Sequence, residues 1–431
     1  SAQDYFVGEL PGMQLDTFNT TLRMHAGYVT VQQPQDQQLF FWQFDATVRR
    51  DRNVLLIWLN GGPGCSSLDG LFLENGPLKV IDKDHVAWNP YGWNQYADVL
   101  YVDQPAGTGF STGQIKDYAH TETEIVERFL SFYDRYLEIF PQHRDAELYF
   151  AGESYAGTYL PYITAAMLKR NEAAGRDIYR IQSLLIGNGW IDPLRQYAGY
   201  ETFAVANGLL PLGTSYATLY QERWAKCAAS YEKSPNRIHH NDCEELLSVI
   251  LDVSRDETQH GHRCINMYDI RFRDPRPQQS CGADTWPVGL PAVGEYLARP
   301  DVLKALHVDP NRAPWRECND DVGGALAHDT SAPASTLLPY ILSKTKVTLF
   351  NGDRDLICAW FGSWYMAGNL TWNGARGLAD ADRYDWYLDG RLVGWKASAR
   401  NLTYITVHNA SHMVPLDLPD VALEILHTTI G

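Results

Sequence analysis

Residues 147–157 read ELYFAGESYAG, and this stretch decides the fold. Its first half, Glu147 to Ala151, is an apolar and aromatic run of the kind that forms a buried parallel strand. Gly152 to Gly157 follows directly, and a helix is expected from Tyr159 to Lys169. A serine between small residues at a sharp strand-to-helix turn is typical of a nucleophile elbow, which lifts the hydroxyl above the sheet. Ser154 is therefore a candidate nucleophile, and Ala156 stands where the common pattern has its second glycine.

Similar apolar runs lie on both sides of this stretch. They cover residues 54–59, 99–102, 181–186, 346–350 and 404–407. The clearest helix begins at a capping box, Thr121 with Glu124, and its apolar residues then recur at helical spacing as far as Phe140. Strands that alternate with helices predict an α/β fold with a doubly wound, mostly parallel sheet.

The pattern changes between residues 192 and 295. The sequence there has a helical pattern with charged and aromatic residues instead of strand-like runs, and the segment holds four of the seven cysteines. The strand pattern resumes at residue 346. We therefore expect residues 1–191 and 296–431 to form the two parts of one core, with 192–295 as a helical cap insertion.

The composition limits the classes of function. Of the 431 residues 45% are hydrophobic and 20% charged, which suits a globular protein with a large core. The formal net charge of −16 argues against nucleic acid as a partner, because phosphate binding needs clustered Lys and Arg. This charge either keeps the protein soluble or attracts basic peptides. Apolar runs such as 54–59 are well short of the roughly 18 residues of a membrane span, so none is expected.

The cysteines and sequons indicate an oxidising compartment. The seven cysteines lack the paired spacing of a zinc site, and their odd number suggests three disulfides and one free thiol. Candidate N-glycosylation sites stand at Asn19, Asn369, Asn401 and Asn409. We expect a protein of the secretory pathway, in a Golgi-type or vacuole-like compartment or secreted. The N-terminus lacks a basic end followed by an apolar run, so any signal peptide is expected to have been removed.

A serine nucleophile needs a histidine to take its proton and a carboxylate to orient that histidine. In this fold the partners follow in the order serine, acid, histidine. Asp353 and Asp355 both stand in a loop after the strand at 346–350, and His412 follows the strand at 404–407. His412 is the candidate base, and either aspartate could orient it.

A glycine-rich loop, NGGPGCSS at 60–67, follows the strand at 54–59. It does not fit a phosphate cradle, because the spacing is wrong and no lysine follows. It fits half of an oxyanion hole, with the N–H groups of Gly62 and Tyr155 converging on the developing negative charge. A simple tight turn is the alternative.

Six segments together resemble the serine carboxypeptidase family over nearly the whole chain. They are Asn60 to Ser67, Asp103 to Ser111, Gly152 to Gly157, Gly187 to Gly189, Asp353 to Cys358 and His412 to Pro415. The resemblance implies an α/β-hydrolase fold with a cap, and a triad of Ser154, Asp355 and His412. It also implies an acyl-enzyme mechanism that releases single residues from peptides with a free C-terminus, with no metal and no organic cofactor.

The resemblance further implies that Asn60, Gly61, Glu74 and Glu153 bind the terminal carboxylate of the substrate. Two glutamates then face a third carboxylate, and like charges this close cannot all ionise in a dry pocket. At least one glutamate must stay protonated, which predicts binding that is best below neutral pH. The alternative to this binding role is that Glu74 is an ordinary solvated residue on a helix.

The family's disulfides would pair Cys65 with Cys318, Cys227 with Cys243, and Cys264 with Cys281. Cys358 is left over, three residues after Asp355. It is either a small core residue or a thiol that lines the acyl-side subsite and is sensitive to mercurials.

Within the family, segments 189–193, 264–268 and 400–403 are most similar to the fungal Golgi-type members that trim basic residues from precursors. That type carries an acidic tail and a membrane anchor after the catalytic part; neither is present in this chain, which suggests a trimmed or naturally soluble form. The resemblance places Asp69, Leu73 and Met413 in the leaving-residue pocket, and Trp190, Tyr197 and Tyr200 on the acyl side. Asp69 could pair with a leaving Lys or Arg. An Asp at the matching position is also compatible with family members that prefer apolar leaving residues, so Asp69 alone does not decide the specificity.

Three rival functions remain open at this point. A carboxypeptidase of broad or hydrophobic specificity is one. An acyltransferase or hydroxynitrile lyase on the same fold would keep the triad but would not need both Glu74 and Glu153. A non-catalytic adhesion or chaperone protein would tolerate the loss of triad residues, and none is missing.

Overall fold

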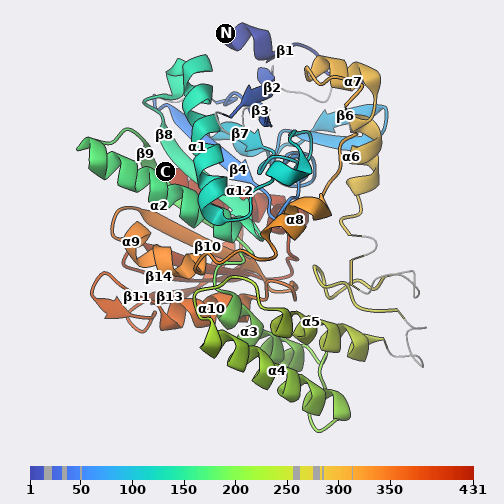
Figure 1. Ribbon diagram of the computed structural model, residues 1–431, viewed down its shortest axis with the longest axis vertical. Coiled ribbons are helices and arrows are strands. Elements are labelled where there is room, and N and C mark those ends of the chain that lie inside the picture. The colour runs from blue at the N-terminus through green and yellow to red at the C-terminus, as the bar shows by residue number, and fades with distance from the viewer. Residues whose placement is uncertain are drawn as a thin grey trace.

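The computed structural model describes residues 1–13, 22–31, 36–48, 51–255, 263–274, 282–283, 286–312 and 314–431. Within them, eleven strands form one sheet in the order β1-β2-β3-β7-β4-β8-β9-β10-β15-β14-β13 (Figure 1). The six central strands are parallel, and antiparallel strands extend both edges. The doubly wound sheet expected from the sequence is therefore confirmed.

The parallel strands are β7 (Asp98–Val102), β4 (Val54–Leu59), β8 (Glu147–Glu153), β9 (Arg180–Gly187), β10 (Lys346–Gly352) and β15 (Leu402–Val407). The antiparallel strands are β1 (Phe6–Val7), β2 (Met24–Thr30), β3 (Gln38–Phe44), β13 (Asp382–Leu388) and β14 (Arg391–Ala399). Two small ribbons are β5 (Leu78–Asp82) with β6 (His85–Trp88), and β11 (Thr371–Trp372) with β12 (Ala375–Arg376). Each of the six predicted runs lies in a strand of the central parallel set.

Both faces of the sheet are covered, which explains why its central strands read as continuous apolar runs. All six residues of β4 are buried, and they alternate between two cores. Leu55 and Ile57 pack with α1 (Glu122–Ile139), α2 (Ala156–Ala174) and α9 (Leu338–Leu342). Leu56 and Trp58 pack with α6 (Leu290–Leu297), α7 (Pro300–Ala305) and α12 (Pro419–Ile430).

The predicted cap on α1 is present: the Thr121 side chain accepts from Glu124 N at 3.2 Å. The Glu124 carboxylate in turn accepts from the backbone N–H of His120 at 2.8 Å. Three further helices that lie after the insertion are α8 (Asp320–Leu326), α10 (Trp360–Asn369) and α11 (Val414–Asp417).

The segment after β9 is helical. It contains α3 (Pro193–Ala206), α4 (Ser215–Lys233) and α5 (Asn241–Ser254), which share a separate apolar cluster and lie to one side of the sheet (Figure 1). α3 also packs closely on α10, because a Cβ on Gly199 would lie 2.5 Å from Gly362 N. The expected boundary at residue 295 falls within α6, whose side chains join the core of the sheet.

Two of the expected disulfides, Cys65–Cys318 and Cys227–Cys243, are present. Cys264 is also disulfide-bonded, and its expected partner Cys281 lies outside the described residues. Cys358 is free and buried. None of the described helices is long and apolar enough to cross a membrane.

Candidate active site

Ser154 occupies the turn between β8 and α2. Its φ of 59° is unusual for a residue other than glycine and marks a strained turn. Backbone hydrogen bonds hold it there, from Ser154 N to Gly187 O at 3.1 Å and from Trp190 N to Ser154 O at 2.7 Å. Gly61 of the neighbouring loop lies against the same turn, because a Cβ on it would be 2.3 Å from Tyr155 N. Only glycine allows that approach.

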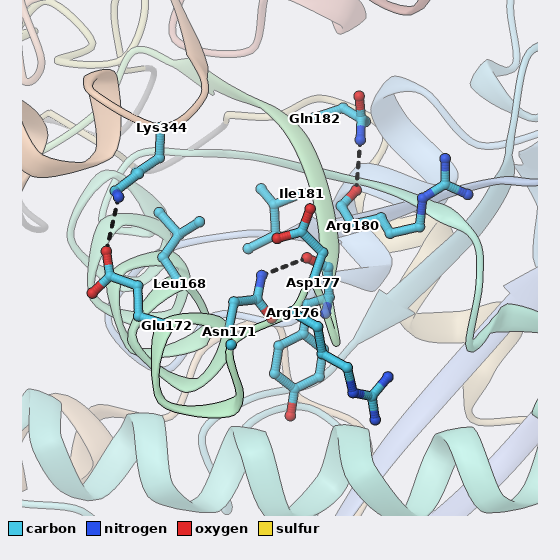
Figure 2. A pocket seen from close by; sticks show the side chains of 11 residues that line it. Leu168, Asn171, Glu172, Arg176, Asp177, Arg180, Ile181, Gln182 and Lys344 are labelled. Carbon is cyan, nitrogen blue, oxygen red and sulfur yellow. Dashed lines mark hydrogen bonds and ion pairs between the residues drawn. The ribbon is translucent and has the colours of Figure 1, made fainter.

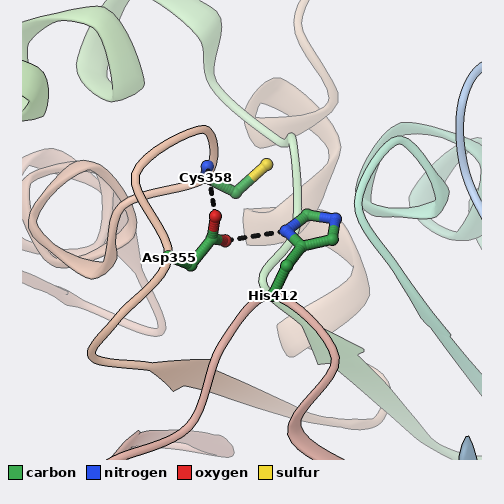
Figure 3. Close-up of side chains that lie close together, drawn as sticks. All are labelled: Asp355, Cys358 and His412. Carbon is green, nitrogen blue, oxygen red and sulfur yellow. Dashed lines mark hydrogen bonds and ion pairs between the residues drawn. The ribbon is translucent and has the colours of Figure 1, made fainter. Parts of the chain in front are cut away.

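His412 and Asp355 come together at the carboxyl ends of β15 and β10 (Figure 3). The Nδ1 atom of His412 lies 2.7 Å from Oδ2 of Asp355, and both side chains are almost completely buried. The His412 ring also packs edge-on against Tyr268, with centroids 5.1 Å apart. This contact and the carboxylate fix the orientation of the imidazole, with Nδ1 toward Asp355.

Asn188 supports the same carboxylate, a role that sequence reasoning missed. Its Nδ2 donates to Asp355 Oδ2 at 2.8 Å, and its Oδ1 accepts from Gly352 N at 3.1 Å. Its motif, Gly187 to Gly189, was visible in the sequence, but nothing there indicated this contact.

Asp353, the competing acid, faces elsewhere. Its Oδ1 accepts from Asn409 N at 2.8 Å, and its Oδ2 lies 3.2 Å from His408 Nδ1. It is a turn residue that ties two loops together.

Cys358 connects the nucleophile with the other two side chains. Asp355, Cys358 and His412 each place a donor atom within 4.8 Å of the others (Figure 3). Burial raises the pKa of the Cys358 thiol well above its usual value, and nearby Asp355 and Glu153 add to this, while a hydrogen bond with Ser154 opposes it. The Cys358 thiol is therefore favoured in its neutral form, in contact with Ser154.

A pocket of about 310 Å³ opens beside Ser154. Its described lining includes the predicted oxyanion residues Gly62 and Tyr155, the predicted acyl-side residues Trp190, Tyr197 and Tyr200, and Cys358. Two titratable residues of the lining, His239 and Glu244, were missed by sequence reasoning. Ser154 thus borders the same cavity as several aromatic side chains.

Glu74 and Glu153 meet at the side chain of Asn60. The Asn60 amide has a defined orientation, because its Oδ1 accepts from Trp58 Nε1 at 2.7 Å and from Gly70 N at 3.0 Å. Its Nδ2 therefore faces the two glutamates, at 3.2 Å from Glu74 Oε1 and 3.0 Å from Glu153 Oε1.

The two glutamates are buried and hydrogen-bonded to each other, so they must share a proton. Burial raises the pKa of Glu74 to about 7, opposed by its hydrogen bonds with Glu153 and Asn60. Burial and the neighbouring Glu74 raise the pKa of Glu153 well above its usual value. Glu74 is therefore not a solvated helix residue.

The predicted leaving-residue side chains lie around η3 (Gly70–Glu74). Asp69 precedes η3 and Leu73 lies within it, while Met413 precedes α11, which packs on η3. Asp69 is 2% exposed, and its Oδ1 has no hydrogen-bond partner among the described residues. Burial raises its pKa well above the usual value, and the nearby carboxylate of Glu317 adds to this.

Glu317 was missed by sequence reasoning, although its neighbour Cys318 was the expected partner of Cys65. Burial raises the pKa of Glu317 to about 7. Its backbone carbonyl accepts from Ser66 N at 2.7 Å, which fixes it beside the 60–67 loop. Two carboxyl groups, those of Asp69 and Glu317, therefore lie near each other beside this loop.

A second pocket, of about 500 Å³, lies between the end of α2 and the start of β9 (Figure 2). Its polar groups satisfy one another: Lys344 pairs with Glu172 at 2.9 Å, and Asn171 donates to Tyr179 O at 2.8 Å. It is at the amino end of β9, whereas sites in such sheets form at the carboxyl ends. It is not a candidate site.

Of the sequons, Asn369, Asn401 and Asn409 are exposed, and Asn19 lies outside the described residues.

Comparisons with known proteins agree with this geometry. A family model described as serine carboxypeptidase matches residues 11–431. The pheromone-processing carboxypeptidase KEX1 of Fusarium vanettenii is 40% identical over 437 residues, which cover 100% of this chain and 70% of that protein. The protein of the same name from Paracoccidioides brasiliensis (strain Pb03) is 41% identical over 444 residues, covering 100% of this chain and 68% of that protein.

A solved structure is also similar over its full length. It is a prohormone-processing carboxypeptidase from Saccharomyces cerevisiae, with a TM-score of 0.91 and 32% identity. The match covers 100% of this chain and 96% of that one.

Proposed function

The chain belongs to the serine carboxypeptidase family, and we propose that Ser154, His412 and Asp355 carry out its hydrolysis of C-terminal peptide bonds. Ser154 attacks the carbonyl carbon of the last peptide bond and passes its proton to His412. His412 then donates this proton to the leaving amino acid, and water hydrolyses the acyl-enzyme by the same route in reverse. Asp355 keeps Nδ1 of the imidazole protonated, so that Nε2 is free to act as the base.

The N–H groups of Gly62 and Tyr155 stabilise the oxyanion that forms in each step. Asn60, Gly61 and the protonated pair of Glu74 and Glu153 bind the terminal carboxylate of the substrate. This pair favours acidic conditions, because a second negative charge there would repel the substrate carboxylate.

The substrate class is peptides and propeptides that end in Lys or Arg. The observation that carries this proposal is Asp69, a buried carboxyl group with an unpartnered oxygen beside Glu317. A cationic side chain beside these two carboxyl groups would favour their ionised form and pair with it. The names of the relatives, which process pheromones and prohormones, support such a role.

Disulfides and exposed sequons support a glycoprotein of a Golgi-type or related secretory compartment. Of the expected insertion 192–295, the part from α3 to α5 would then act as the cap beside the acyl side, from which His239 and Glu244 line the pocket.

The test is kcat/KM for N-blocked dipeptides that end in Arg, Lys, Leu or Phe, each compared with its C-terminal amide. We expect release from the free acids only, and fastest for Arg and Lys. Equal rates for Arg and Leu would favour a broad or hydrophobic specificity, whereas cleavage of the amides would exclude recognition of a terminal carboxylate.

A further inference from the structure

The acyl-side pocket contains a single carboxylate, Glu244, among the described residues that line it. The rest of the lining is mostly aromatic or aliphatic, which alone would suit an apolar penultimate residue. A negative charge in such a wall changes the kind of side chain that the pocket accepts.

The position of Glu244 is fixed from two directions. It follows Cys243 at the start of α5, and the disulfide from Cys243 to Cys227 ties α5 to α4. The Tyr197 hydroxyl, itself part of the pocket, donates to Glu244 Oε1 at 2.5 Å. The carboxylate is therefore held against the wall of the pocket by one of its two oxygens.

Helix stabilisation does not account for this arrangement. Acidic residues in the first turn of a helix interact favourably with its dipole, and Asp242 shares that position. The next acid along the chain, Glu245, pairs with Arg223 at 2.6 Å. Of these three acids, only Glu244 lines the pocket.

The cations near the pocket do not cancel this charge. Burial lowers the pKa of His239, although the nearby carboxylates of Glu244 and Asp329 oppose this shift. Arg237 is not among the lining residues.

We propose that Glu244 makes the acyl-side pocket selective for a cationic residue, Lys or Arg, at the penultimate position of the peptide. This inference rests on the proposed peptidase function. It extends the recognition of basic side chains from the last residue of the peptide to the residue before it. A peptide that ends in two basic residues would place the last at Asp69 and the one before it at Glu244. After the first cleavage, the residue that was at Glu244 becomes the next leaving residue.

The test uses four N-blocked dipeptides, with Arg or Leu at the penultimate position combined with Arg or Leu at the end. The preference for penultimate Arg is the ratio of kcat/KM for Arg to that for Leu, taken separately for each leaving residue. Because Glu244 is at an exposed edge of the pocket, we expect Glu244→Gln to lower this ratio about three- to fivefold. Added salt should lower the ratio of the parent enzyme in the same direction.

Two further variants test whether the effect belongs to Glu244 alone. Glu245→Gln removes a neighbouring carboxylate outside the pocket and should keep the ratio. Asp242→Asn removes the other acid of the first turn of α5, which is also outside the lining, and should keep the ratio as well. A ratio that is unchanged in Glu244→Gln, or that falls equally in Glu245→Gln or Asp242→Asn, would overturn the inference. The preference at the leaving position is measured separately, by comparing dipeptides that share the penultimate residue and end in Arg or Leu. If the parent enzyme showed no preference for a final Arg in that comparison, the proposed substrate class would be wrong.

Discussion

Glu74 and Glu153 are hydrogen-bonded to each other and share the amide nitrogen of Asn60, at 3.2 and 3.0 Å. The Asn60 amide nitrogen has two N–H groups and can donate one to each glutamate, but two buried carboxylates this close repel each other unless a proton lies between them. If the terminal carboxylate binds here as proposed, the shared proton limits the negative charge that it meets. The titration of this pair would then connect substrate binding to pH.

We predict that replacing both Glu74 and Glu153 with Gln removes this connection. In the parent enzyme, KM should rise as the pH increases through about 7, because the pKa of Glu74 is raised to about 7 and loss of its proton brings repulsion. The double variant should bind more weakly in acid, and its KM should no longer rise over that range. Steady-state kinetics with one dipeptide at several pH values measures both. A KM profile like that of the parent would mean that the terminal carboxylate binds elsewhere.

Ser154→Ala should abolish turnover and leave the fold intact. The substitution removes only the attacking hydroxyl, and losses of about 10⁴-fold or more are typical of such changes. Circular dichroism and thermal unfolding would check the fold. Residual activity within tenfold of the parent would refute the assignment of the nucleophile.

Much of the fold could be predicted from the sequence because its signals are local. Each parallel strand is a short apolar run, and the α1 cap rests on two residues three positions apart, Thr121 and Glu124. The nucleophile turn is equally local, since β8, Ser154 and α2 are contiguous.

The rest of the site could not be predicted, because it depends on contacts between distant segments. Glu317 reaches Asp69 through a disulfide between residues 253 positions apart. Asn188 supports Asp355 only because β9 and β10 are neighbours in the sheet. Glu244 lines the same pocket as Ser154, which is 90 positions earlier in the chain, and no local pattern distinguishes Glu244 from Glu245.

We predict that soft metal reagents inactivate the enzyme by reacting with Cys358. Its thiol is neutral, since burial raises its pKa, so alkylating agents that need a thiolate should react slowly. A small mercurial should inactivate the enzyme faster, because the nearby donors of Asp355 and His412 can help to hold the metal. Cys358→Ser should be resistant to the mercurial. Equal inactivation of parent and variant would show that the reagent acts elsewhere.

Stability should decrease between about pH 5 and pH 8. Burial raises the pKa of Glu122 to about 8 from 4.5, and that of Asp103 to about 6 from 3.8. A carboxyl group whose pKa is raised by folding contributes its stability below the unfolded value and loses it as the pH rises through the folded value. Glu122→Gln, which cannot titrate, should reduce the fall in Tm by several degrees, whereas exposed Glu127→Gln on the same helix should not. A Tm that rises from pH 5 to 8 would contradict this sign.

The preference for a leaving Arg over Leu should itself depend on pH, because Asp69 and Glu317 must ionise to pair with a cation. The pKa of Asp69 is raised well above its usual value and that of Glu317 to about 7, so both carry protons in acid when the pocket is empty. The Arg-to-Leu ratio of kcat/KM should therefore increase as the pH rises toward 7, even while binding of the terminal carboxylate weakens for both substrates.

Asp69→Asn should lower the ratio by about ten- to a hundredfold and flatten its pH dependence, since a partly desolvated ion pair is lost. Glu317→Gln should have a smaller effect in the same direction, and Asp321→Asn, an exposed acid nearby in sequence, should have none. A ratio that stays constant with pH and survives both pocket substitutions would locate the basic specificity in other residues.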